Sequence, residues 1–299
     1  MAAVLSSALL WAYWPLLGDM AERWSTDPKY SHGYLVPVFA AWLLWRRARL
    51  ATPPRRAGSW WGLPVLLAGL GLKLAGAYVY VGPLAEGSFL VSLTGLCLCL
   101  GGKDLLRLAW PSIAFLVFTL PLPFRVEVAL SQPLQRLATL SSTYLLQMLG
   151  FYAAAEGHVV VLSSGSLGVI EACSGLGMLM TFLAMATAVA VCLKRPLLDR
   201  VVVVASAVPV ALAVNVLRIA ATGVVHETLG PRAAQVVFHD FAGWLMMPLA
   251  LALVWLELKA LSRLLVEVPR EDRSRKALDL GLNVRPAARR RKAKVSVPR

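Results

Sequence analysis

Residues 201–219 form the predominantly apolar run VVVVASAVPVALAVNVLRI, which decides the class of fold. A helix needs about 20 mostly apolar residues to cross about 30 Å of membrane hydrocarbon. This run has that length, and its most polar side chains, Asn215 and Arg218, stand near one end. It therefore predicts a membrane-spanning helix that carries two strongly polar groups close to one membrane face.

Apolar runs of the same kind recur along the chain. Hydrophobic residues make up 58% of the 299 residues and charged residues only 15%, which is more apolar surface than a soluble domain needs. We expect eight spans, at residues 4–18, 32–45, 60–81, 88–100, 108–122, 175–193, 201–219 and 243–258. The predicted fold is all-α, a polytopic membrane helical bundle of about eight transmembrane helices.

Residues 124–151 differ from these runs because charged and amide side chains alternate with Val, Leu and Met at roughly helical spacing. That pattern favours an amphipathic helix that lies at the membrane interface or packs against the bundle. We predict such a helix on the outer side, followed by a short extracytoplasmic loop. Residues 165–168, with the sequence GSLG, are predicted to be part of a loop and match no phosphate-binding motif.

The basic residues indicate the orientation of the bundle. Lys and Arg number ten in the three short loops on one side of the predicted spans and five on the other. Short cytoplasmic loops carry the excess of Lys and Arg, so both termini should be cytoplasmic, in a cell inner (cytoplasmic) membrane protein. Residues 1–260 are the predicted membrane domain, and residues 261–299 a basic, disordered cytoplasmic tail.

The net charge of +14 has its origin in these loops and in the tail. Charge distributed in this way is evidence of membrane topology first and of a binding partner only second. The tail is most simply attracted to anionic membrane lipid, and no nucleic-acid partner is expected.

The predicted orientation brings three reactive residues from distant segments to the outer membrane face. Cys173 opens the sixth span, Arg218 closes the seventh, and His239 precedes the eighth. A cysteine at a helix start is favoured as a thiolate by unpaired N–H groups and the macrodipole. A guanidinium stabilises an oxyanion or clamps a carboxylate, and an imidazole titrates near neutral pH. The three groups together suit acyl transfer at the thiol, including peptide-bond cleavage.

Each of the three residues also has a structural interpretation. Cys173 suits a small buried position at a helix start. Arg218 suits a side chain that snorkels to the lipid headgroups. His239 suits a hydrogen-bonded residue at the aqueous interface.

A metal site has little support in the sequence. His32, His158, His226 and His239 are all expected on the outer side, yet no two are four residues apart. Cys-x-x-Cys and His-Glu-x-x-His motifs are absent from the sequence. We therefore expect no metal and no cofactor.

The residues that carry the chemistry resemble the exosortase/archaeosortase family of membrane transpeptidase-like enzymes. The resemblance rests on Glu-Ala-Cys-Ser-Gly at 171–175, Asn-x-x-Arg at 215–218 and the segment around His239, in this order. Tyr-Ser-His-Gly-Tyr at 30–34, before an apolar run that ends in Trp-Arg-Arg, is also similar. The similarity covers roughly residues 10–260, and the histidine is typical of the bacterial exosortase branch.

The resemblance implies a role for each of these residues. Cys173 would be the nucleophile, Arg218 would stabilise the transition state or a substrate carboxylate, and His239 would be the acid and base. The implied supporting or substrate-binding positions are Glu171, Ser174, Asn215 and His32. The implied substrates are secreted proteins with a C-terminal hydrophobic sorting signal of the PEP-CTERM type, cleaved at the outer face through a thioester.

Two other classes of function stay open. A membrane transporter or channel would line its path with Arg218, Lys73 and Glu171, and it favours paired charges near the midplane and repeated halves. Most charges here are terminal and no repeat is visible. A non-catalytic scaffold of an exopolysaccharide export system would need none of the three reactive residues.

Overall fold

The computed structural model describes residues 2–50, 58–168, 175–193 and 195–236, and the single positions 252, 253, 255, 256 and 259. The chain divides into two compact units, Met1–Trp255 and Leu256–Arg299, and the fold described below is that of the first. Most of the predicted span 243–258 lies outside the described residues.

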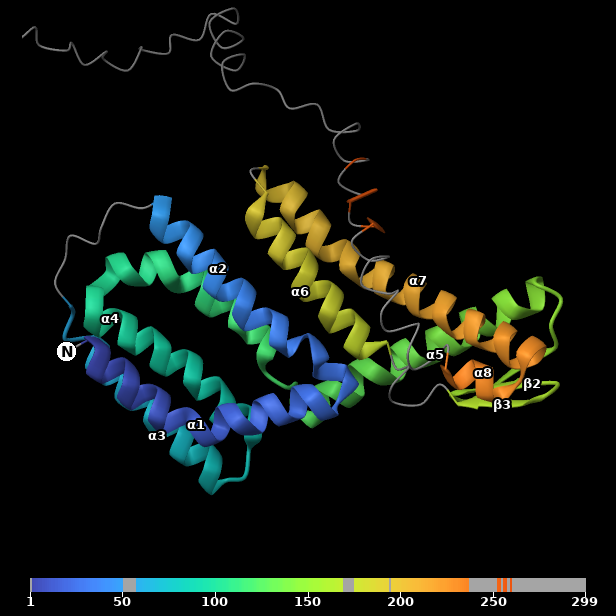
Figure 1. Cartoon of the computed structure of the whole chain (residues 1–299), viewed down its shortest axis with the longest axis horizontal. Helices are drawn as coiled ribbons and strands as arrows, with labels where there is room; N and C mark the ends of the chain where they lie inside the picture. Colours follow the sequence, from blue (N-terminus) through green and yellow to red (C-terminus); the bar gives the residue numbers. More distant parts are fainter. Residues whose placement is uncertain are drawn as a thin grey trace, which may run out of the picture. The chain divides into compact units, whose positions relative to one another are not determined.

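Helices make up most of this unit (Figure 1). The α-helices of the described residues are α1 (Ala2–Thr26), α2 (Leu35–Leu50), α3 (Gly62–Tyr78), α4 (Gly82–Phe115), α5 (Phe124–Met148), α6 (Leu176–Cys192), α7 (Leu197–Leu229) and α8 (Pro231–Val236). Two 3-10 helices, η1 (Pro28–Tyr34) and η2 (Leu116–Thr119), follow α1 and α4. The predicted helical fold class is confirmed, with a small sheet added to it.

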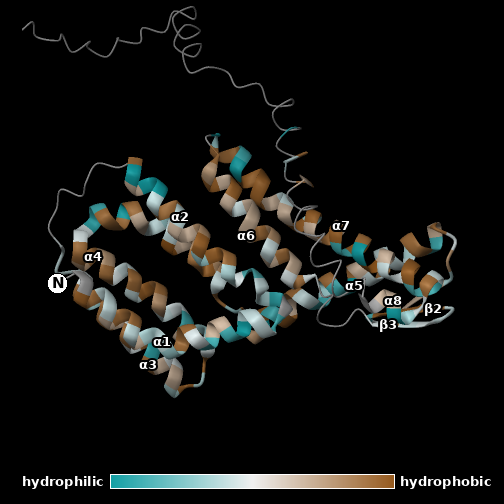
Figure 2. Cartoon of the chain, in the orientation of Figure 1, coloured by the Kyte–Doolittle hydropathy of each residue, from teal (hydrophilic) through white to brown (hydrophobic). Residues whose placement is uncertain are grey.

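Within the described residues, two stretches are long and apolar enough to cross a membrane, Gly82–Thr119 and Leu197–Leu229, and the shorter helices α3 and α6 are also apolar (Figure 2). The first stretch covers the predicted span 88–100, most of the predicted span 108–122 and the charged loop expected between them at residues 103–107. The prediction of a loop was wrong, because α4 stays helical there and changes direction at Gly102. With φ of 61° and ψ of −153°, this residue has a conformation that glycine adopts at low cost.

α3 and α4 pack closely through a row of glycines. Gly62, Gly69 and Gly76 are buried at heptad spacing on α3. A Cβ added at Gly69 would lie 2.2 Å from Oγ of Ser92, and one at Gly76 would lie 2.6 Å from the main-chain nitrogen of Ala85. Small residues at such positions let helix backbones approach one another, as in helix pairs within lipid.

Polar groups between α1, α3 and α4 are paired inside the bundle. The hydroxyl of Tyr13, a fully buried residue, lies 3.0 Å from Oγ of Ser88 and 2.9 Å from Oγ of Ser92. Lys73 donates a hydrogen bond to the main-chain oxygen of Ala12, and its ammonium lies 4.8 Å from the centre of the Tyr13 ring. Internal pairing of this kind is what a lipid surrounding requires, because hydrocarbon offers no hydrogen bonds.

α5 confirms that the amphipathic stretch predicted at 124–151 is helical, and the helix ends slightly earlier, at Met148. Its buried residues Ala138, Ser142 and Leu146 recur every four positions, which places them on one face. Leu146 packs against Gly223 of α7, where an added Cβ would lie 2.9 Å from Cδ1 of Leu146. The two helices therefore meet along this buried face of α5.

A three-stranded antiparallel sheet follows α5, and the sequence did not predict it. Strands β1 (Ala153–Glu156), β2 (Val159–Leu162) and β3 (Gly165–Gly168) pair in chain order. The expectation of a loop at 165–168 was wrong, since Gly165 pairs with Leu162 and Gly168 with Val159. Glycine and serine have low strand propensity, so the neighbouring strand rather than local preference determines β3.

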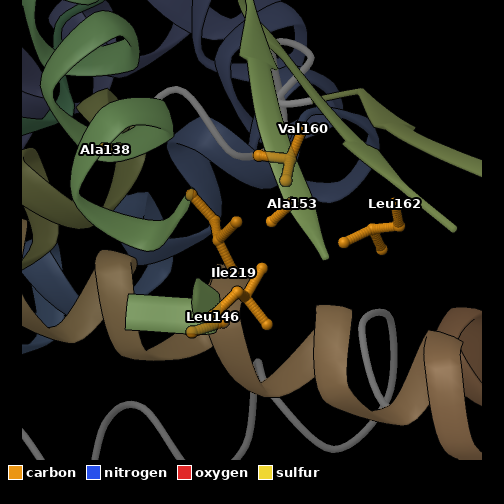
Figure 3. Packing of buried hydrophobic residues seen from close by; sticks show 7 residues of the cluster. Ala138, Leu146, Ala153, Val160, Leu162 and Ile219 are labelled. Atoms are coloured by element: carbon orange, nitrogen blue, oxygen red, sulfur yellow. The ribbon is translucent and has the colours of Figure 1, made fainter. Parts of the chain in front are cut away.

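The sheet closes one hydrophobic core of the unit. Val160 and Leu162 of β2 gather with Leu146 of α5 and Ile219 of α7 (Figure 3). Leu146 and Val160 have no exposed surface, and Ile219 is 2% exposed. This core therefore joins the middle of α7 to the sheet and to the second half of α5.

Candidate functional site

The N-terminal end of α6 contacts α7 at the predicted Asn-x-x-Arg segment. The helix begins at Leu176, close to the predicted residue 175, and its N-cap Gly175 has a left-handed φ of 73°. A Cβ added at Gly175 would lie 3.2 Å from Nδ2 of Asn215. The last residue of the Glu-Ala-Cys-Ser-Gly motif thus packs against the first residue of the Asn-x-x-Arg motif.

The N-terminal segment η1 reaches the same end of α6. A Cβ added at Gly177 would lie 2.9 Å from Cα of Lys29, so glycine is required for this close approach. Asp27 holds the start of η1, because its Oδ1 accepts a 2.9 Å hydrogen bond from the main-chain nitrogen of Lys29. Three segments that are far apart in the sequence therefore converge at the first turn of α6.

An ion pair connects η1 to the amphipathic helix α5. Lys29 Nζ lies 3.0 Å from Glu127 Oε1, and the two side chains are only 18% and 22% exposed. Next to this pair, burial raises the pKa of Tyr30, and the Glu127 carboxylate raises it further. A partly buried pair is screened less than a surface pair, so this contact stabilises the position of η1.

His32 occupies a buried position in η1, just before α2. The predicted span 32–45 begins three residues later than expected, at Leu35. The residue is 3% exposed, and burial lowers the pKa of His32, against a smaller raising effect of the main-chain oxygens of Phe118 and Lys29. Neither ring nitrogen makes a hydrogen bond of normal geometry within the described residues. The imidazole is therefore neutral at pH 7.

Asn215 and Arg218 stand three residues apart on α7, and so on one face of the helix. Asn215 is 1% exposed, and Arg218 is half-buried. The helix α7 extends beyond the predicted span, which ended at residue 219, and continues to Leu229. The charge of Arg218 had suggested a boundary, yet the residues after it form helix equally well.

The family model for transmembrane exosortases (Exosortase_EpsH) matches residues 24–256. The chain belongs to the transmembrane exosortase family. The matched range includes η1, α5, α6 and α7, and hence every contact described above for the first turn of α6. Family membership implies a membrane protein of the class of sorting proteases and transpeptidases. Neither a curated protein nor a solved structure matches the chain.

Four predicted site residues of this exosortase lie outside the described residues, and their roles remain predictions. They are Glu171, Cys173, Ser174 and His239. Of the other three predicted positions, Asn215 contacts the N-cap of α6, and Arg218 follows it on the same helix face. His32 belongs to η1, whose Lys29 contacts Gly177.

The sequence did not indicate a hydrogen-bonded cluster near the C-terminal end of α7. Oγ of Ser164 lies 2.8 Å from Nδ1 of the buried His226. The main-chain nitrogen of Ser164 donates a 3.1 Å hydrogen bond to Oε1 of Glu227. The cluster attaches the β2–β3 turn of the exosortase to α7. No local pattern could reveal it, because its partners are distant in sequence.

Some charged side chains of the described residues have structural partners. Lys73, once a candidate for a transport path, is held by Ala12 and Tyr13 as described above. Nη1 of Arg23 lies 2.8 Å from Oε1 of the buried Glu86. Within the described residues, no group of three or more His, Cys, Asp or Glu side chains forms a metal site.

Proposed function

We propose that this exosortase is a membrane cysteine protease and transpeptidase. Its substrates are secreted proteins, and it cleaves their C-terminal sorting signal, of the PEP-CTERM type, at the outer face of the inner membrane. Cys173 is the nucleophile, Arg218 stabilises the transition state or a substrate carboxylate, and His239 transfers protons. Glu171, Ser174, Asn215 and His32 support the site or bind substrate.

The observation that carries this proposal is the contact between Gly175 and Asn215. An added Cβ on Gly175 would be 3.2 Å from the Asn215 amide, so the residue that ends the cysteine motif packs on α7. Arg218 lies on the face of α7 that Asn215 occupies, nearly one turn along. This contact supports the proposal that the two motifs of the resemblance form one site, as a shared active site requires.

The proposed reaction proceeds in two acyl transfers. The Cys173 thiolate attacks the scissile carbonyl carbon, and the carbonyl oxygen becomes an oxyanion beside the Arg218 guanidinium. The C–N bond breaks as His239 gives a proton to the leaving amine, which departs with the hydrophobic segment. An acceptor amine or water then attacks the thioester, His239 takes its proton, and the thiolate is released.

The membrane contributes to this reaction by holding both partners in two dimensions. A substrate anchored by its own hydrophobic segment meets the enzyme at a set depth in the membrane. This supplies part of the rate enhancement that comes from proximity of the reacting groups. The excess of Lys and Arg in the loops of one side supports cytoplasmic termini and a site on the opposite face.

The direct test co-expresses the full chain with a secreted protein that ends in a PEP-CTERM signal and follows loss of the signal by its mass. Cys173→Ala should abolish processing while leaving the amount of membrane-inserted protein unchanged. Cys192→Ala, a matched cysteine replacement within α6, should process the substrate as the parent does.

A trapping experiment examines the same step chemically. Membranes incubated with a peptide of the substrate tail should yield an acyl adduct on Cys173, detected by peptide mass spectrometry. Processing that persists in Cys173→Ala would exclude Cys173 as the nucleophile.

A further inference from the structure

An apolar groove lies between α1, α2 and α4. Its cavity has a volume of about 370 Å³. α1 lines it with Leu17, Met20 and Trp24, which recur at helical spacing, and α2 contributes Ala41 and Leu44 among others. Each wall is therefore a stripe along one helix, and the cavity runs along the helices.

α4 lines the groove twice because it reverses direction at Gly102. Leu93 and Cys97 come from the part before the bend, and Ala109 and Ile113 come from the part after it. Hydroxyl groups are few in the lining, and that of Thr119 donates a 2.6 Å hydrogen bond to the main-chain oxygen of Leu116. The groove therefore suits hydrocarbon rather than water.

The volume of the groove selects among apolar occupants. The cavity has room for about a dozen groups the size of a methylene. Each such group takes about 30 Å³, which is also the volume of one water molecule in the liquid. One turn of a helix is about 5.4 Å long and about 10–12 Å across, and so fills more space than the cavity provides. A single lipid acyl chain fits, and a complete helix does not.

Basic side chains surround the end of the groove at Leu44. Four of them stand directly beyond the lining residues of α2 and α4, at Arg46, Arg47, Lys103 and Arg107. Asp104 is the only acidic residue in the same two segments, 42–50 and 103–109. This basic cluster, Arg46, Arg47, Lys103 and Arg107, gives the end of the groove a positive charge.

Contacts of the arginines place this end at a headgroup level. Nε of Arg47 donates a 2.9 Å hydrogen bond to the main-chain oxygen of Leu108, which joins α2 to α4 beside the groove. The Arg46 guanidinium lies 5.3 Å from the centre of the Trp42 ring. Tryptophan with adjacent cations is typical of the membrane–water interface, where phosphate groups are found.

We propose that the groove binds one acyl chain of an anionic phospholipid, with the phosphate of its headgroup on the basic cluster. Apolar lining, the volume of one chain and a positive end match the two halves of such a lipid. The proposal does not depend on the proposed function. The hydrophobic segment of a secreted substrate is the rival occupant, and the volume disfavours it.

A bound chain would also support η1. Trp24 lines the groove and packs on Gly33, where an added Cβ would lie 2.4 Å from Cδ1 of Trp24. The Trp24 and Tyr34 rings are 5.4 Å apart in an edge-to-face arrangement. η1 in turn contacts Gly177 of α6. The lipid would thus stabilise the segment that meets the candidate site.

The test titrates the delipidated full chain in detergent with phosphatidylglycerol or phosphatidylcholine of identical chains, and counts bound lipids by native mass spectrometry. The parent should bind one phosphatidylglycerol tightly and phosphatidylcholine weakly. Ala41→Trp, which fills the groove, should lose that lipid. Val38→Trp, at a 67% exposed position of the same helix outside the lining, should retain it. Lys103→Gln and Arg107→Gln should each weaken phosphatidylglycerol binding about fivefold, since one basic residue near an anionic lipid is worth about 1 kcal/mol.

A second measurement avoids any folding defect of these variants. Cys97 lines the groove and Cys192 does not. Phosphatidylglycerol should slow the reaction of N-ethylmaleimide with Cys97 and leave the reaction of Cys192 unchanged. Equal binding of the two lipids, equal loss in Ala41→Trp and Val38→Trp, or protection of Cys97 by a sorting-signal peptide but not by lipid would overturn the proposal.

Discussion

The α3–α4 pair and the core between α5, the sheet and α7 are held together by different means. Gly69 and Gly76 bring the backbones of α3 and α4 into contact, and Tyr13 of α1 adds buried hydrogen bonds to α4. The second region instead buries aliphatic side chains such as Leu146 and Val160. Lipid tails are as apolar as leucine, so helices inside a membrane gain from close contact and hydrogen bonds. Aliphatic burial stabilises a structure only where water is the alternative environment.

The largest effect is expected in the aliphatic core. Leu146→Ala removes a fully buried side chain from the contact between α5, the sheet and α7, and should lower the free energy of unfolding by about 3 kcal/mol. Leu137→Ala, at a 50% exposed position of the same helix, should change it little. Denaturant titration of the purified full chain measures both. Equal losses would show that this region is not held by a buried core.

A smaller effect is expected when the glycine contact between α3 and α4 is broken. A Cβ at Gly69 would collide with Ser92, so Gly69→Ala should cost about 1–3 kcal/mol, as overpacking does. Gly71→Ala is the matched control, because nothing lies within 4 Å of a Cβ at that position. It should leave the protein as stable or slightly more stable. The same unfolding measurement applies, and an unstable Gly71→Ala would argue against the packing.

The ion pair that joins η1 to α5 is a third kind of contact, because it combines partial burial with charge. Lys29→Met and Glu127→Gln, singly and together, should give a coupling energy of about 1 kcal/mol in a double-mutant cycle. The single variants should also slow processing of a sorting-signal substrate, since η1 contacts α6 through Lys29.

Arg195 and Asp199 supply the control cycle for this pair. Nη1 of Arg195, which precedes α7, lies 3.6 Å from Oδ2 of Asp199 in the first turn of that helix. The control cycle should also give a coupling energy in the free energy of unfolding, but its variants should not slow processing of the substrate. Slower processing there would attribute the effect to general loss of stability rather than to η1.

The smallest effect is a pH dependence at η1. Burial lowers the pKa of His32 in the folded state, so the unfolded chain binds a proton first as the pH falls. The contribution of the buried neutral His32 to the free energy of unfolding is complete above pH 6.5, the ordinary pKa of histidine, and is lost as the pH falls below it. The thermal midpoint should therefore fall between pH 7 and pH 5, and His32→Gln should reduce that fall. An unreduced fall in His32→Gln would contradict this assignment.

Much of the helical structure could be predicted because apolar periodicity and span length are local properties. The run 201–219 lies within α7, and the amphipathic stretch 124–151 is α5 except for its last three residues. The ends were less predictable. Arg218 had suggested a boundary that the helix passes, and the charged residues 103–107 had suggested a loop where α4 bends only at Gly102. Charged side chains suit an exposed helical turn and a loop equally well.

The candidate site was predictable in part. The motif residues themselves stand out in the sequence, and the contact between Gly175 and Asn215 agrees with their expected proximity. The supports of the site were not visible. Lys29 and Glu127 are almost a hundred positions apart, and Ser164 meets His226 only after β2 and β3 have paired. Such pairs have no signature within either segment.

By itself, the sequence determined that this protein is a membrane helical bundle with a cysteine, an arginine and a histidine motif in the order of the exosortase family. These properties follow from hydrophobicity and residue order, which each segment carries alone. Only the tertiary structure decided that α4 folds back at Gly102, that 165–168 become a strand, and that η1 meets α6 at Gly177. Each of these depends on a partner surface from a distant segment, and the backbone adopts them because the energy of that contact exceeds its local preference.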